Sequence, residues 1–196
     1  MIRIGIDNGA NGAIVAIGDD HRIVASYLMP VIDVGVRRTR SNPKPHQTKT
    51  YKGTKRILDR QAVLRLLRDL IAQSRDDIFA VLEEARAGQK EGRGSIFTSG
   101  RGYGAMEMAL DALGIPFQIE KPSIWQRAVL RGVEGTDTKA RAIVYAQRMY
   151  PDLDMLPGKK RKPHDGLADA CCMAHYALTI RPPRRRRRRP PVPVVS

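Results

Sequence analysis

Residues 2–17, with the sequence IRIGIDNGANGAIVAI, decide the fold. Ile2, Ile4 and Ile6 recur at a period of two, so they share one face of a predicted strand. Asp7 stands where this strand ends, two Asn-Gly pairs follow as turn signals, and residues 13–17 form a second apolar run. The stretch therefore predicts two strands joined by a glycine-rich turn, with a carboxylate placed to hold a cation near a phosphate. An ordinary hairpin with a turn aspartate fits the same residues.

The charge of the chain predicts a polyanionic partner. The 196 residues include 35 Lys and Arg against 20 Asp and Glu, a formal net charge of +15. Nucleic acid is the simplest partner for such a balance. We expect one folded domain over residues 1–180 and a disordered tail over residues 181–196, where prolines surround a run of six arginines.

Cysteine content and hydropathy predict the compartment. Cys171 and Cys172 are adjacent, which does not suggest a disulfide framework, and we expect them to pack in the core. No run of about 18 apolar residues is present, so no membrane span is predicted. We expect a cytoplasmic protein, either bacterial or encoded by a phage and working in the host cytoplasm.

The rest of the chain alternates strand and helix patterns. A third strand over 21–29 would complete an antiparallel meander, and the apolar run 78–82 predicts a buried parallel strand after a crossover helix over 59–74 that Asp59 caps. Further elements are expected as a helix over 105–113, a strand over 115–119, a helix opening at 121–122 around a core Trp125, and a helix over 138–150. The predicted fold class is α/β, with a mixed five-stranded sheet flanked by helices.

Basic residues gather in three segments that we expect to contact DNA phosphates. Residues 31–58 form a basic insertion whose prolines and Gly53 predict irregular, mobile structure, and residues 85–103 read as a glycine-rich loop. A third run at 159–162 precedes the last helix. The candidate DNA-binding residues are Arg37, Arg38, Arg40, Lys44, Lys49, Lys52, Lys55, Arg56, Arg93, Arg101, Tyr103, Lys159, Lys160, Arg161 and Lys162.

Acidic residues recur at the ends of elements. Glu83 and Glu84 close the buried strand, where a carboxylate is costly unless it faces solvent, a partner or a metal. Asp165 and Asp169 lie four apart on the predicted last helix, and like charges at this spacing favour a cation between them. Asp165 is also suited to a helix start, and His164 fits either a substrate contact or a surface position.

The order of these motifs resembles the ribonuclease H-like superfamily, and within it the RuvC-type Holliday junction resolvases of phages and organelles. The matching segments are GIDNG at 5–9, VLE at 81–83, GRGYG at 100–104 and ADA at 168–170. Many bacterial members place the last two acids three apart, which would fall on Gly166 here, so Asp165 is the less certain of the pair. The motif favours Glu83 over Glu84.

The resemblance implies a function and a set of site residues. Asp7, Glu83, Asp165 and Asp169 would be the catalytic metal ligands for two Mg²⁺ ions, with Mn²⁺ as a substitute, in two-metal phosphodiester hydrolysis. It also implies a homodimer that resolves four-way DNA junctions by paired symmetric nicks, without a small-molecule cofactor. The helix around Met106 and Leu110 is the dimer contact expected from this likeness.

Other functional classes remain open at this stage. A different ribonuclease H-like nuclease would act on branched DNA or on RNA–DNA hybrids. A non-catalytic DNA-binding protein would explain the charge but not four acids in a polyanion binder. Actin-like ATPases and sugar kinases share the first strand and turn, but they need a second such turn and a second domain, and the sequence shows neither.

Overall fold

A computed structural model describes residues 1–41, 48–74, 77–85, 92–159 and 161–182, with the backbone alone described at 37–41, 48–51 and 159. The elements in chain order are β1 (Ile2–Asp7), β2 (Ala13–Gly18), β3 (Ile23–Leu28), β4 (Val31–Ser41), β5 (Thr48–Leu58), α1 (Arg60–Gln73), β6 (Ile78–Glu83), α2 (Arg93–Ala112), β7 (Phe117–Glu120), α3 (Pro122–Val129), α4 (Thr138–Met149), the short 3₁₀ turn η1 (Pro157–Lys159) and α5 (Asp165–Thr179). No helix in the described ranges is long and apolar enough to cross a membrane.

The main sheet has five strands in the order β3-β2-β1-β6-β7. The meander β1–β2–β3 is antiparallel, whereas β6 runs parallel to β1 and β7 runs parallel to β6. The predicted mixed sheet, an antiparallel meander followed by parallel strands, is therefore confirmed.

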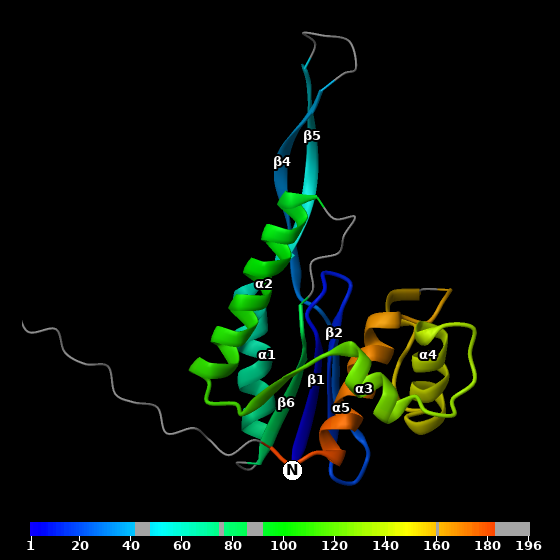
Figure 1. The fold of residues 1–196 in the computed structure, drawn as a ribbon. Coiled ribbons are helices and arrows are strands. Elements are labelled where there is room, and N and C mark those ends of the chain that lie inside the picture. The colour runs from blue at the N-terminus through cyan, green and yellow to red at the C-terminus, as the bar shows by residue number, and fades with distance from the viewer. Residues whose placement is uncertain (42–47, 75–76, 86–91, 160, 183–196) are drawn as a thin grey trace, which may run out of the picture.

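Helices cover both faces of this sheet (Figure 1). The predicted alternation in β1 is confirmed, because Ile2, Ile4 and Ile6 all face the cluster that contains α1 and α2. The opposite face packs against α3, α4 and α5, and there Val15 and Ile17 of β2 are fully buried. Burial on both faces explains why the central strands read as nearly continuous apolar runs.

Gly5 allows α5 to lie directly on β1. A Cβ atom at position 5 would stand 2.0 Å from the carbonyl oxygen of Ala170 and 2.4 Å from the amide nitrogen of Ala174. Any side chain there would push the helix away from the strand. The glycine therefore sets the distance between the strand that carries Asp7 and the helix that carries Asp169.

The insertion at 31–58 is a long β-hairpin, so the prediction of irregular structure there is wrong. β4 and β5 pair antiparallel from Val31 opposite Leu58 to Ser41 opposite Thr48, and the hairpin projects beyond the main sheet beside the first turns of α2 (Figure 1). A continuous ladder of backbone hydrogen bonds stabilises the arm, and Gly53 fits within it opposite Val36. The two prolines that suggested a loop lie at 42–47, outside the described residues.

The glycine-rich segment is helical from Arg93 onward, so the predicted loop is wrong over 93–103. Its glycines have weak helix propensity, and the buried residues of the helix begin only at Met106. The first turns contact the hairpin instead, where Lys55 donates hydrogen bonds to Gly94 and Thr98. Met106 and Leu110 are 0% exposed. Their side chains belong to the core and are not available to a second copy, while a dimer contact through the helix around them stays a prediction.

The remaining local predictions are confirmed with small shifts of boundary. The Asp59 carboxylate accepts hydrogen bonds from the amides of Gln61 and Ala62 at the start of α1. Trp125 is fully buried, and both cysteines are buried and unpaired. β7 begins two residues later than expected, at Phe117.

Candidate active site

Two predicted acids stand side by side at one end of the sheet. Asp7 ends β1 and Glu83 ends β6, and these parallel strands pair up to Ile6 opposite Leu82, one residue before each acid. The carboxyl ends of parallel neighbours meet at the same sheet edge. The Asp7 Oδ1 atom accepts a hydrogen bond of 3.0 Å from the amide of Gly9, which holds this carboxylate against the following turn.

The first turn of α5 brings the other two acids to the same edge. Gly166 lies against the β1–β2 turn so closely that a Cβ there would stand 2.4 Å from the carbonyl oxygen of Asn11. His164 caps the helix, because its Nδ1 accepts a hydrogen bond of 3.3 Å from the Leu167 amide. His164 is buried, so its predicted surface position is wrong. The docking of this turn places Asp165 and Asp169 beside Asp7.

The four carboxylates share one electrostatic environment. Burial is the main reason why the pKa of Asp169 rises to about 7, and the negative charges of Asp7, Glu83 and Asp165 raise it further. The pKa of Asp7 is raised mainly by burial, although the Gly9 hydrogen bond opposes the rise. The structure thus brings the four predicted acids within electrostatic reach of one another, and it disfavours the negative charge of Asp7 and Asp169.

Lys139 is a member of this site that the sequence did not predict. Its Nζ atom lies 2.5 Å from the Asp165 Oδ2 atom, and the hydrogen bond raises the pKa of Lys139 and lowers that of Asp165. The sequence pattern placed Lys139 on the outward face of its helix, and the lysine and aspartate side chains are indeed 68% and 41% exposed. An exposed pair contributes little to stability, about 0–1 kcal/mol, so Asp165 can exchange this partner for another cation.

Trp125 orients Glu83 from beneath the site. Its Nε1 atom donates a hydrogen bond of 3.0 Å to Glu83 Oε2. Glu84 lies toward α2, where the pKa of Tyr103 is raised mainly by burial and further by the charges of Glu107 and Glu84. The charge of Glu83 acts on Asp169 instead. The two adjacent glutamates therefore face opposite sides of the sheet, and Glu83 is the one that joins the acid cluster.

The donor set of this cluster suits a hard divalent cation. Carboxylate oxygens are the ligands that Mg²⁺ and Mn²⁺ prefer, and a cation would relieve the repulsion that raises the pKa of Asp169. Within the described part of the chain, no group of three or more Asp, Glu, His or Cys side chains is placed to hold a metal ion. A cation bound among these acids would therefore require their side chains to move closer together and Asp165 to release Lys139.

The predicted DNA-binding residues lie on three surfaces. Lys55 and Arg56 stand at the base of the hairpin, where Lys55 donates hydrogen bonds to the Gly94 carbonyl and the Thr98 hydroxyl of α2, and Arg56 donates one of 2.8 Å to Asn11. Further cationic side chains are exposed at Lys52 on the hairpin, at Arg93 and Arg101 on α2, and at Arg161 and Lys162 before α5.

Tyr103 is only partly exposed and packs against the core on the sheet side of α2. Seven other candidates fall where side chains are not described, namely Arg37, Arg38, Arg40, Lys44, Lys49, Lys159 and Lys160.

No protein-family model matches this sequence, and no curated protein matches it. Among solved structures, the chain is similar to Thermus thermophilus RuvC, with 18% identity, a TM-score of 0.47, and coverage of 91% of this chain and 92% of that one. It is also similar to T. thermophilus RuvC in complex with a Holliday junction substrate, with 15% identity, a TM-score of 0.48 and the same coverage. At this identity the similarity concerns the path of the chain and not its chemistry. The chain is thus similar in fold to RuvC, whose family its sequence motifs resemble.

Proposed function

We propose that the protein is a metal-dependent endonuclease that resolves four-way DNA junctions. The observation that carries this proposal is the convergence of Asp7, Glu83, Asp165 and Asp169 at one sheet edge in a chain of net charge +15. A basic protein attracts the DNA backbone, and a cluster of acids repels it unless a cation lies between them. Hydrolysis of a phosphodiester uses this arrangement of hard ligands around divalent ions.

Asp7, Glu83 and Asp169 would hold the divalent cations, two in each site, and Asp165 would join them by releasing Lys139. When bound, the cations supply Lewis-acid activation of water and neutralise charge on the leaving oxygen. Trp125 holds the Glu83 carboxylate in place, and the Gly9 amide does the same for Asp7.

The released Lys139 ammonium is placed to bind a phosphate oxygen of the strand at the site. Its side chain is 68% exposed and already reaches the acid cluster. The charged hairpin base and α2 would hold the flanking backbone, because Lys and Arg contacts to phosphate position DNA without reading its sequence. The basic residues would therefore orient the DNA strand, and the acids would bind the cations that act on its phosphate.

Paired cutting would require two sites related by a two-fold axis, which a homodimer supplies. The exposed face of α2 supports this proposal in place of the buried residues named from the sequence. Phe97 and Met108 are each 68% exposed, and Gly104 between them has open space above it. Arg101 lies over the Phe97 ring at 5.8 Å. Phe97, Gly104 and Met108 recur at helical spacing, so they share one stripe that a second copy can cover.

Cleavage of end-labelled DNA tests the proposed function. In Mg²⁺ the wild-type protein should nick a four-way junction symmetrically and leave linear duplex of the same sequence largely intact, and EDTA should abolish the reaction. Asp7→Asn should lose cleavage by orders of magnitude while it retains junction binding, because the shape of the site is kept and one ligand is lost. Glu83→Gln should be far more damaging than Glu84→Gln. Full activity of Asp7→Asn would exclude the metal site, and binding without any cleavage by the wild type would favour the non-catalytic alternative.

A further inference from the structure

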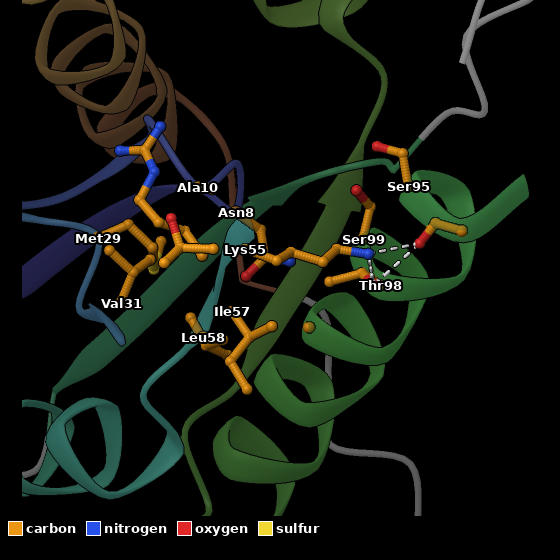
Figure 2. Close-up of a pocket in the computed structure, with 14 residues that line it drawn as sticks. Asn8, Ala10, Met29, Val31, Lys55, Ile57, Leu58, Ser95, Thr98 and Ser99 are labelled. Carbon is orange, nitrogen blue, oxygen red and sulfur yellow. Dashed lines mark hydrogen bonds between the residues drawn. The ribbon is translucent and has the colours of Figure 1, made fainter. Parts of the chain in front are cut away.

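A cavity of about 530 Å³ lies beside the acid cluster, between the base of the hairpin and the first turns of α2 (Figure 2). Its walls come from the β1–β2 turn, the start of β4, the end of β5 and one side of α2. Figure 2 shows the Lys55 side chain crossing from β5 toward Thr98 and Ser99 on the helix. The volume lies within the range of pockets that bind small organic groups.

The walls combine an apolar floor with a cationic and hydroxylated rim. Met29, Val31, Ile57 and Leu58 supply apolar surface, and the rim carries Lys55 together with hydroxyl groups, namely Ser95, Thr98 and Ser99. None of the fourteen residues that line the cavity is acidic. A ligand that is flat and apolar on its faces, polar at its edges and attached to a negative charge matches these walls.

The cavity is also joined to the catalytic turn. Asn8, which lines it, directly follows Asp7, and Arg56, which also lines it, donates a hydrogen bond to Asn11. The Asn8 Oδ1 atom is enclosed without a hydrogen-bond partner among the described residues. The Asn8 amide therefore has unused hydrogen-bonding capacity between the acid cluster and the cavity.

We propose that this cavity receives the base of one unpaired nucleotide of the DNA strand whose phosphate lies at the acid cluster. The apolar floor takes the base, and Lys55 and Arg56 bind the phosphate that follows it. This inference rests on the proposed function, because it assumes a DNA strand at Asp7. The cavity would distinguish a strand with an unstacked nucleotide from fully stacked duplex, because only the unstacked base can fill it. Phosphate contacts alone cannot make this distinction.

Gly102 offers a way to fill the cavity without disturbing the helix. A Cβ atom there would make ordinary contacts of 3.8 Å with Leu58 Cβ and 4.0 Å with Asn8 Nδ2, so Gly102→Gln directs its side chain into the cavity. Gly100 lies on the same helix with open space above it, so Gly100→Gln directs the same side chain to solvent. Glutamine is a better helix former than glycine, and both variants should melt at or above the wild-type temperature.

The test compares a short oligothymidylate with a strand of equal length made only of abasic sites, by fluorescence anisotropy of the full chain at fixed salt. Ca²⁺ is present so that a cation lies between the acids and the phosphate. The wild type and Gly100→Gln should bind the strand with bases about tenfold more tightly. Gly102→Gln should lose this preference and keep the wild-type affinity for the abasic strand. If Gly102→Gln does not fold, Gly102→Ala should reduce the preference in the same assay.

Equal binding of both strands by the wild type would overturn the proposal, and so would a full preference in folded Gly102→Gln. Neither result would touch the nuclease proposal, because this assay measures binding and not cleavage. Conversely, the protein could prefer strands with bases and yet never cleave a junction in Mg²⁺. The cavity would then still be assigned as a base-binding site, and the proposed nuclease function would be wrong.

Discussion

Replacing Asp169 by asparagine should stabilise the metal-free protein. The structure raises the pKa of this carboxyl from 3.8 to about 7, so its ionised form is less favourable in the folded state than in the unfolded state. Stability is therefore lost as the pH rises from about 4 to about 7, at about 1.4 kcal/mol for each pH unit. Above pH 7 the total reaches about 4 kcal/mol, an upper figure because water reaches part of the site. Asparagine has nearly the same shape and cannot ionise, so it removes this penalty.

Urea denaturation of wild type and Asp169→Asn in EDTA measures the effect. The variant should be the more stable protein at pH 8, and the difference should shrink as the pH is lowered to 5. Mg²⁺ should stabilise the wild type more than the variant, because a ligand that binds only the folded state adds to its stability. A variant that is less stable than wild type at pH 8 in EDTA would refute the idea that the acids repel one another.

Asp165→Asn is the matched control, because the ion pair with Lys139 lowers the pKa of Asp165. A lowered pKa contributes stability that is present above pH 4 and is lost only as the pH falls further, so this substitution should be neutral or slightly destabilising at both pH 5 and pH 8. Stabilisation by Asp165→Asn equal to that by Asp169→Asn would show a general effect of removing negative charge.

Four further changes test other parts of the structure. Trp125→Phe removes the hydrogen bond to Glu83 and keeps most of the buried bulk. The cleavage rate should fall about tenfold or more, and the half-maximal rate should need a higher Mg²⁺ concentration. An unchanged Mg²⁺ dependence would assign Trp125 to packing alone. Gly5→Ala should lower stability by about 3 kcal/mol or more by thermal denaturation, since its methyl group meets the α5 backbone, and a near-neutral effect would contradict the close packing. Removal of the residues after Ile180 should leave the melting temperature unchanged. Binding to junction and duplex DNA should weaken to the same extent and depend less on salt. Loss of the preference for junctions alone would make the tail a specificity element. Phe97→Glu should give folded monomers by sedimentation that no longer make paired nicks, whereas a folded monomer that still cuts symmetrically would exclude the dimer.

The sheet and most helices could be predicted because their signals are local. The alternation of Ile2, Ile4 and Ile6 and the N-cap at Asp59 each act within a few residues, and the structure has both. The start of α2 at Arg93 could not be predicted, because its glycines favour a loop and its contacts with Lys55 of the hairpin come from a distant part of the sequence. The hairpin was missed for a related reason, since a ladder between residues far apart in the sequence leaves little local signal.

The difference between local signals and contacts of distant residues also applies to the candidate site. Asp7, Glu83 and Asp165 stand at the ends of elements, which is visible in the sequence, and their charges act on Asp169 one turn further along α5. The residues that pair with these acids or orient them are not visible in the sequence. Lys139 and Asp165 are 26 residues apart, Trp125 and Glu83 are 42 apart, and neither pair produces a sequence pattern. Gly166 looked like a gap in a family motif, but the structure shows that the turn beside it leaves no room for a side chain.

The central claim is that the acid cluster binds divalent cations. Anomalous diffraction from crystals of the protein soaked in Mn²⁺ tests it most directly, because the scattering identifies the ion and its ligands together. We predict anomalous density between the carboxylates of Asp7, Glu83 and Asp169, with Lys139 withdrawn from Asp165, and no such density in Asp7→Asn. Crystals that take up no Mn²⁺ at this sheet edge, with the Lys139–Asp165 pair still closed, would contradict the account.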